Sequence, residues 1–167
     1  MKTIILPGYS LHNKDWAQDL KRELNLGHEI IVHNWEHWQG KASLSPRRET
    51  ARILQELGEG EVNIIAKSVG TFICVILAPN LKGRVRKVIL CGIPSVSNDR
   101  KEKFIDGLRE IPSENVICFQ NAGDPFASYD EVKIFLAGVS PKIKVIKKER
   151  SDHSYPYPEE FTRFLNE

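Results

Sequence analysis

The chain has 167 residues, of which 41% are hydrophobic and 11 are glycine. These values are typical of one globular domain, and we expect a single domain over residues 1–167. Lys and Arg number 24 against 22 Asp and Glu, a net charge of +2. Nucleic-acid-binding domains are far more basic, so we expect no nucleic-acid partner.

The three cysteines, Cys74, Cys91 and Cys118, lie in separate apolar runs. An odd number of widely spaced thiols is typical of a cytosolic protein rather than of a disulfide framework. No apolar run approaches the roughly 18 residues that span a bilayer. The first residues, M-K-T-I-I-L-P-G, also lack the apolar core of a secretory signal. We therefore expect a cytoplasmic protein with no membrane partner.

Six short apolar segments, rich in β-branched residues, recur along the chain and predict strands. They are residues 4–6, 30–32, 62–66, 88–90, 116–119 and 143–146. Most are continuously apolar, which is typical of parallel strands covered on both faces, whereas the last one alternates as an edge strand does.

Helix signals fill the segments between these strands. They are the helical spacing of Trp16, Leu20 and Leu24, a Ser45-Pro46 start with an end at Gly58, a capping box at Ser128 and Glu131, and Pro158 at the start of a last helix. Alternating strands and helices predict an α/β protein with helices on both faces of a parallel sheet, a three-layer α/β/α sandwich.

The segment A-K-S-V-G, residues 66–70, directly follows the third predicted strand. A small residue, any residue, Ser, any residue and Gly is the pattern of a nucleophile elbow, where a sharp strand-to-helix turn exposes the serine hydroxyl. Residues 69–78 are so β-branched that propensity alone favours a strand. Because the elbow requires a helix after the serine, we predict a buried helix there.

The same segment superficially resembles the end of a phosphate-binding loop. That loop requires glycine at positions 61 and 66, where the chain has Glu61 and Ala66. No G-x-G-x-x-G follows the first predicted strand either, where Gly8 stands alone. A nucleotide-binding domain is therefore the weakest of our hypotheses.

Two further candidates for catalysis follow later strands. Asp124 comes after the fifth predicted strand and His153 after the sixth. Ligands bind beyond the carboxyl ends of the strands in such sheets, so Ser68, Asp124 and His153 are expected to meet. A serine hydroxyl needs an imidazole to take its proton, and the imidazole needs a carboxylate to orient it. Asp99 is the main alternative acid, and Asp152 is a weaker one.

The chain order Ser, Asp, His resembles that of the α/β-hydrolases, most closely their small serine hydrolases without a lid. The resemblance runs from Pro7-Gly8-Tyr9 to the last helix and implies a six-stranded parallel sheet ordered 2-1-3-4-5-6, a minimal form of that fold. Only residues 92–112 stand at the lid position, so an open, shallow site is expected. The resemblance also implies an oxyanion hole made by the backbone N–H groups of Tyr9 and Val69.

These features together predict a serine hydrolase that cleaves small carboxylic esters or related acyl compounds through an acyl-enzyme. We expect a small-molecule acyl substrate, no cofactor and no metal. The elbow departs from the common family pattern at Ala66 and Lys67, which bears on substrate preference. The alternative is a non-catalytic binding protein on the same scaffold.

Ser10, His12 and Lys67 are candidates for substrate binding. For Ser10 and His12 the simpler interpretation is a polar start of a helix, and Lys67 either meets an anionic substrate group or points to solvent. His33 and His37 have the i, i+4 spacing of metal ligands in a helix, but no third ligand is evident. We therefore expect a loop whose residues Trp35 and Trp38 pack against or line the site.

Overall fold

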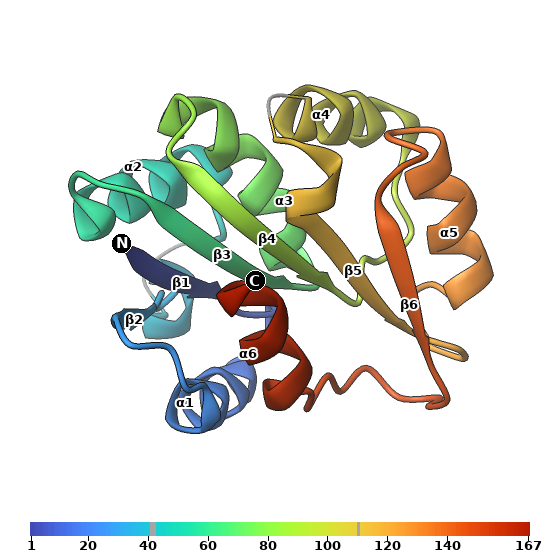
Figure 1. Ribbon diagram of the computed structural model, residues 1–167, viewed down its shortest axis with the longest axis horizontal. Helices are drawn as coiled ribbons and strands as arrows, with labels where there is room; N and C mark the ends of the chain where they lie inside the picture. Colours follow the sequence, from blue (N-terminus) through green and yellow to red (C-terminus); the bar gives the residue numbers. More distant parts are fainter. Residues whose placement is uncertain (41–42, 110) are drawn as a thin grey trace.

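The sheet of the computed structural model, which describes residues 1–40, 43–109 and 111–167, has the strand order β2-β1-β3-β4-β5-β6 (Figure 1). All five neighbouring pairs are parallel. The strands are β1 (Lys2–Leu6), β2 (Glu29–Val32), β3 (Val62–Lys67), β4 (Val85–Cys91), β5 (Val116–Asn121) and β6 (Lys144–Lys148). The predicted strands and their order are confirmed, and β6 lies at the edge as its alternating pattern predicted.

Helices cover both faces of this sheet. They are α1 (Asn13–Glu23), α2 (Pro46–Leu57), α3 (Val69–Leu77), α4 (Asn98–Leu108), α5 (Tyr129–Ala137) and α6 (Pro158–Asn166), with short 3-10 helices η1 (Glu36–Gln39), η2 (Ala78–Leu81) and η3 (Ser113–Asn115). In Figure 1, α1 and α6 lie on one side of the sheet and α2, α3, α4 and α5 on the other. The predicted α/β/α sandwich is confirmed.

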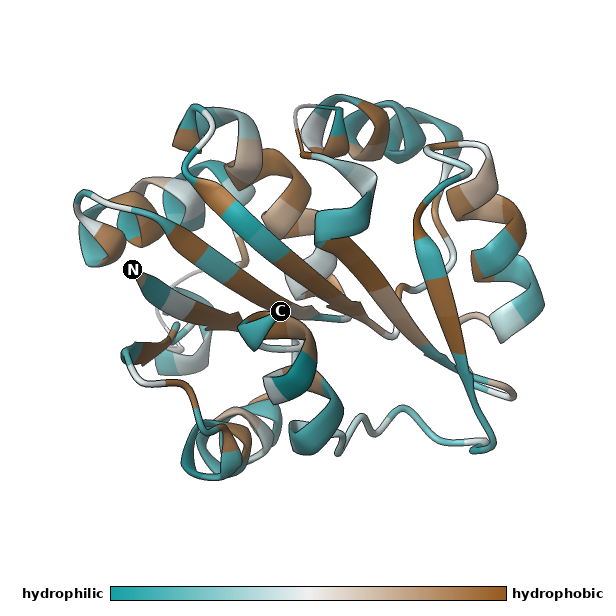
Figure 2. Ribbon diagram, viewed as in Figure 1, coloured by the Kyte–Doolittle hydropathy of each residue, from teal (hydrophilic) through white to brown (hydrophobic). Residues whose placement is uncertain are grey.

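Adjacent strand residues pack into opposite halves of the core. Ile64 of β3 packs with the helices of the α2–α5 layer, whereas its neighbour Ile65 packs with α1 and α6, and neither is exposed to solvent. The strands therefore need apolar residues at successive positions, and Figure 2 shows hydrophobic residues concentrated along them.

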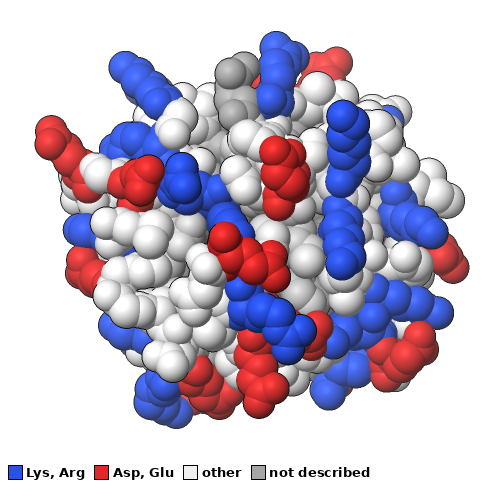
Figure 3. All heavy atoms as spheres, viewed as in Figure 1, with Lys and Arg blue, Asp and Glu red and all other residues white. Residues whose placement is uncertain are grey.

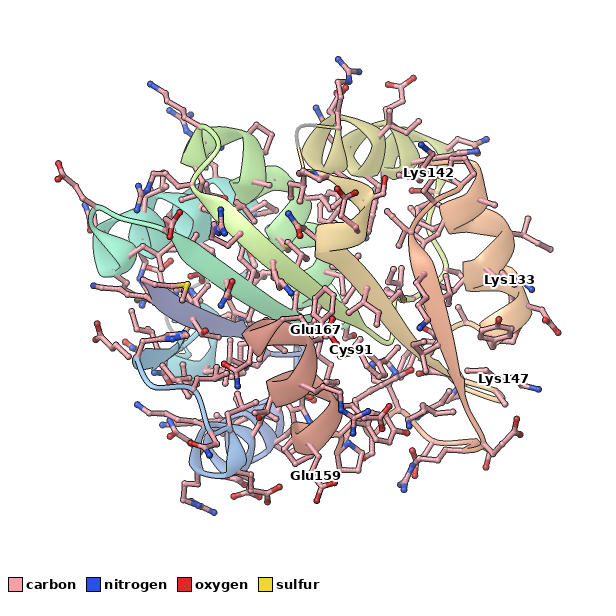
Figure 4. The ribbon with its side chains drawn as sticks, in the orientation of Figure 1. Cys91, Lys133, Lys142, Lys147, Glu159 and Glu167 are labelled. Atoms are coloured by element: carbon pink, nitrogen blue, oxygen red, sulfur yellow. The ribbon has the colours of Figure 1, made fainter. Side chains whose placement is uncertain are left out.

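The cysteines are part of this core. Cys74, Cys91 and Cys118 are free and buried. Burial raises the pKa of the Cys74 thiol to about 12, so the thiol stays protonated and unreactive. Cys91, labelled in Figure 4, is the last residue of β4 and lies at the carboxyl ends of the strands, where the loops of the candidate site begin.

The predicted helix caps of α2 and α5 are confirmed. The Ser45 hydroxyl accepts a hydrogen bond from the N–H of Arg48, and Gly58 ends α2 with φ +57°. Ser128 and Glu131 form the complete capping box of α5. The β-branched segment after Ser68 is helical, as the elbow pattern predicted against local propensity, because its side chains are buried against the sheet and neighbouring helices.

Residues at the lid position form α4, a helix that was not among the predicted elements. Gly107 of α4 lies against α3, where an added Cβ would sit only 2.1 Å from the carbonyl oxygen of Val75. This close approach fixes α4 on the outer side of α3 rather than over the site.

The surface carries interspersed charges of both signs on the face seen in Figure 3. None of the helices in the described ranges is both long and apolar enough to cross a membrane.

Candidate active site

Ser68 lies at a strained turn between β3 and α3. Its φ and ψ are +54° and −122°, and positive φ is rare for a residue with a side chain. The turn is held by the Ser68 N–H, which donates to the Cys91 carbonyl at 2.9 Å, and by Thr71 Oγ1, which donates to the Ser68 carbonyl at 2.6 Å. Backbone strain of this kind concentrates at functional sites.

Gly70 explains why the elbow needs a residue without a side chain two positions after the serine. A Cβ at this position would lie 2.2 Å from the carbonyl oxygen of Leu6 and 2.9 Å from that of Pro7. The start of α3 therefore packs directly on the backbone that leaves β1. This contact brings the first turn of α3, which begins at Val69, against the segment that leads from β1 to Tyr9.

Two tryptophans fix the loop that carries Tyr9 by hydrogen bonds to its backbone carbonyl groups. Trp35 Nε1 donates to the carbonyl of Gly8 at 3.1 Å, and Trp38 Nε1 donates to that of Tyr9 at 2.7 Å. The C=O and N–H groups of a trans peptide point in opposite directions, so the N–H of Tyr9 points away from Trp35. Among the residues that the structure describes, neither this N–H nor that of Val69 donates a hydrogen bond. Both predicted oxyanion donors are therefore unengaged.

His153 and Asp124 are joined by a hydrogen bond. Nδ1 of His153 donates to Oδ2 of Asp124 at 2.6 Å, and the Asp124 side chain is fully buried. Burial alone would raise the pKa of this carboxyl. Hydrogen bonds from His153, from Tyr155 and from the N–H of Phe126 outweigh burial, and the pKa lies below its usual value. The carboxylate is therefore ionised and fixed.

The two alternative acids lie elsewhere. Asp99 is exposed in the first turn of α4, where a hydrogen bond with Ser97 lowers its pKa. Asp152 accepts a hydrogen bond from Arg150 Nε at 3.0 Å and does not bond to the imidazole of the neighbouring His153. Of the three acids considered, Asp124 is the one that contacts His153.

Tyr155 is a functional candidate that no sequence motif indicated. Its hydroxyl donates to Oδ2 of Asp124 at 2.5 Å and accepts from the N–H of Asn121 at 3.3 Å, and the residue is fully buried. Gly92 makes room for it, because a Cβ there would lie 2.5 Å from the Tyr155 ring and 2.8 Å from Cε1 of His153. These contacts position the imidazole and the carboxylate together.

Most of the candidate residues line one cavity of about 760 Å³. It is lined by Tyr9, Ser10, His12, Asn13, Trp16, Asp19, Lys67, Ser68, Phe126, His153 and Ser154. Nε2 of His153 is buried and has no hydrogen-bond partner among the described residues. It is the ring nitrogen that Asp124 leaves free, and a serine hydroxyl or a substrate group can supply its missing partner.

The rim of this cavity is aromatic. Phe126, whose side chain contacts the His153 ring edge-on at 4.6 Å between centroids, is 57% exposed, and Tyr9 is 55% exposed. Large exposed apolar residues next to polar groups are typical of ligand-binding surfaces.

The polar residues before α1 form a connected set. His12 is the N-cap of α1 without a capping hydrogen bond, and its Nε2 lies 3.2 Å from Oγ of Ser10. Asn13 Nδ2 donates to the same oxygen at 2.8 Å, and Asn13 Oδ1 accepts from Nζ of Lys67 at 2.5 Å. Lys67 is only 4% exposed, so of its two alternatives the one in which it points to solvent is wrong.

His33, in the loop after β2, and His37, in η1, have structural partners. His33 is buried, with Nδ1 and Nε2 each 2.8 Å from a carboxylate, those of Glu56 and Glu49. His37 stacks on Tyr9 with 4.4 Å between centroids and bonds to its carbonyl. Within residues 1–40, 43–109 and 111–167, no group of three His, Cys, Asp or Glu side chains could hold a metal ion.

Comparisons with known proteins agree with this architecture. The family model of the alpha/beta hydrolase fold matches residues 4–111. Similar solved structures include a bromoperoxidase from Bacillus anthracis, with 13% identity and a TM-score of 0.68 over 99% of this chain and 92% of that one. A naproxen esterase from Bacillus subtilis is similar with 11% identity and a TM-score of 0.67 over 99% of this chain and 82% of that one. The ydeN gene product of B. subtilis is similar over 99% of both chains, with 13% identity and a TM-score of 0.64.

No curated protein sequence gives a significant match. The family model nevertheless covers well over half of the chain, including the loop that carries Tyr9 and the turn that carries Ser68. The chain therefore belongs to the α/β-hydrolase fold family.

Proposed function

We propose that this protein is a serine hydrolase that cleaves small carboxylic esters or related acyl compounds through an acyl-enzyme on Ser68. One observation carries the proposal. Ser68, on a strained turn, lines the same cavity as His153, whose Nδ1 is hydrogen-bonded to the buried carboxylate of Asp124. The esterase among the similar structures is in keeping with this activity.

In the first half of the reaction, Nε2 of His153 takes the proton of Ser68 as Oγ bonds to the substrate carbonyl carbon. Asp124 holds the tautomer that leaves Nε2 free and stabilises the imidazolium that forms. The carbon–oxygen bond to the leaving group then breaks, and His153 donates its proton to the departing alkoxide. Ser68 is left as an acyl ester.

In the second half, His153 removes a proton from water, whose oxygen attacks the acyl carbon. The bond to Oγ breaks, the carboxylic acid leaves, and Ser68 recovers its proton from His153. In both halves the carbonyl oxygen becomes an oxyanion, which the N–H groups of Tyr9 and Val69 stabilise. Each such donor stabilises the transition state by roughly 2.7–4 kcal/mol.

The aromatic rim suits a small or accessible substrate. Tyr9 and Phe126 offer exposed apolar surface on which an acyl chain or a leaving group can lie. Because α4 packs on α3, no residue of α4 lines this cavity among the described ranges.

A fluorophosphonate probe tests the proposal, since it reacts covalently with activated serines. We expect labelling of the folded wild type and of a Ser154→Ala control, and loss of labelling in Ser68→Ala. Ser154 is the matched control because it lines the same cavity and has no proposed role in catalysis or binding. A folded wild type that is not labelled and cleaves no ester would favour the alternative of a non-catalytic binding protein.

A further inference from the structure

We propose that Lys67 forms a subsite for a carboxylate group of the substrate, so that the preferred substrates are esters carrying a free acidic group. This inference rests on the proposed hydrolase function and names its substrate class. The observation behind it is a buried lysine that lines the cavity of Ser68 and His153.

Strand geometry directs Lys67 toward this cavity. Side chains alternate along a strand, so Lys67, the last residue of β3, faces the same side as Ile65, the side of α1 and α6. Its Nζ accordingly contacts α1, donating to Asn13 Oδ1 at 2.5 Å and lying 5.2 Å from the centroid of the Trp16 ring. Asn13 and Trp16 line the cavity as well.

The ammonium group keeps unused binding capacity. It has three hydrogen-bond donors, and Asn13 is its one hydrogen-bond acceptor among the described residues. Within the same part of the chain, no carboxylate lies within 4.0 Å of Nζ. A buried charge without a counter-ion is unfavourable, and this charge becomes favourable when an anion enters the cavity. A carboxylate supplies one negative charge and two acceptor oxygens.

The neighbouring residues hold Nζ in place. Asn13 is oriented by Ser10, whose Oγ and carbonyl oxygen both accept from Nδ2, at 2.8 and 3.1 Å. The Asn13 side chain occupies space left by Gly8, because a Cβ on Gly8 would lie 2.7 Å from Oδ1. The lysine is therefore pre-positioned in the cavity, which favours specific binding.

The acidic groups near Lys67 do not take the place of the missing counter-ion. Asp124 is already hydrogen-bonded to His153, Tyr155 and the N–H of Phe126. Asp19, which also lines the cavity, forms an exposed ion pair with Arg22. Asp152 is paired with Arg150.

The test uses matched esters that differ only in charge. Monomethyl glutarate and its amide, methyl glutaramate, place the group on the acyl side, and 4-acetoxybenzoate and 4-acetoxybenzamide place it on the leaving-group side. The kcat/KM ratio of acid to amide is measured for wild type, Lys67→Met, Lys67→Gln and the control Lys14→Met, an exposed lysine of the same helix as Asn13. Circular dichroism and Tm establish that each variant is folded.

We expect the wild type and Lys14→Met to prefer the acid of at least one pair by about 10- to 100-fold, the value of a hydrogen bond to a charged group. The Lys67 variants should lose this preference. In Ser68→Ala, calorimetry should detect binding of the same acid and weaker binding of its amide, and this arm needs no catalysis. A wild type that binds and cleaves acid and amide equally in both pairs would overturn the subsite and leave the hydrolase standing. Absence of all ester cleavage and of serine labelling would overturn the hydrolase, and the calorimetric arm would still decide the subsite.

Discussion

Tyr155 and His153 donate to the same oxygen of Asp124, the tyrosine hydroxyl at 2.5 Å and the imidazole Nδ1 at 2.6 Å. The tyrosine therefore stabilises the charge of the carboxylate from within the core of the α1 and α6 layer. It is a positioning residue, since it touches Asp124 rather than the cavity. Burial and the bond to Asp124 both raise the pKa of Tyr155 far above its usual value, so it remains a donor at any working pH.

Replacing Tyr155 by Phe removes a hydrogen bond to a charged group. We expect a loss of about 1.5–3 kcal/mol in the free energy of unfolding at neutral pH. The pKa of Asp124 is lower in the folded than in the unfolded protein. The ionised carboxylate therefore adds to the free energy of unfolding above its unfolded pKa of about 3.9, and this stabilisation is lost as the pH falls through its lower folded pKa. Urea unfolding at neutral and acidic pH should therefore show a smaller difference between wild type and variant in acid. An equal difference at both pH values would contradict this role.

The Asp124→Asn variant should fold and lose turnover by about four orders of magnitude, because the amide no longer holds the productive tautomer of His153. Steady-state kinetics with an activated ester measures the loss. Asp99→Asn is the matched control, since Asp99 is exposed on α4, and it should retain wild-type turnover. A comparable loss in Asp99→Asn, with Asp124→Asn active, would assign the acid to Asp99.

Gly70→Ala tests the close approach of α3 to β1. The new Cβ would overlap the carbonyl oxygen of Leu6, so the start of α3 must shift, which typically costs about 1–3 kcal/mol of stability or more. Gly27→Ala, where nothing lies within 4 Å, should stay within about 0.5 kcal/mol of wild type. Denaturant unfolding measures both values. Equal stability of the two variants would show that the backbone contact does not constrain the elbow.

The preference for acidic esters should depend on pH through Lys67. Burial is the main cause that lowers the pKa of this lysine, and nearby acidic groups offset it only in part. The positive charge is thus lost on raising the pH through a value below the usual pKa of about 10.4. The acid-to-amide ratio of kcat/KM should fall over that range. In Lys67→Arg, whose guanidinium stays charged, the same ratio should not change with pH over that range. A ratio that is constant until an ordinary lysine titrates would contradict the desolvated position of Nζ.

The strands and the elbow were predictable because they follow from local patterns, whereas the strand order was predictable from the resemblance to the α/β-hydrolases. Apolar runs between helix signals identify the strands, and family order supplies their arrangement. The helix after Ser68 was predictable only from the elbow motif, since its β-branched residues favour a strand until burial outweighs propensity. Most strand boundaries differed by one or two residues, as for β6, which spans Lys144–Lys148 rather than residues 143–146.

Other features could not be predicted because they depend on contacts between distant segments. Tyr155 lies in an irregular loop without periodicity, and its role requires Asp124, 31 residues away. The missing third ligand already argued against a metal at the i, i+4 pair His33 and His37, but the contacts of His33 with Glu49 and Glu56 of α2 could not be predicted.

Two features that were not predicted did carry a signal in the sequence. The side-chain alternation from Ile65 places Lys67 toward α1. Phe104 and Leu108 had the i, i+4 spacing that identifies α4.

The central claim is tested most directly by intact-protein mass spectrometry after rapid mixing with a slowly deacylated activated ester. The hydrolase proposal predicts a transient mass increase equal to the acyl group, mapped to Ser68 by peptide analysis and absent in Ser68→Ala. Ester turnover without a covalent acyl group on Ser68, or acylation of another residue in its place, would contradict it.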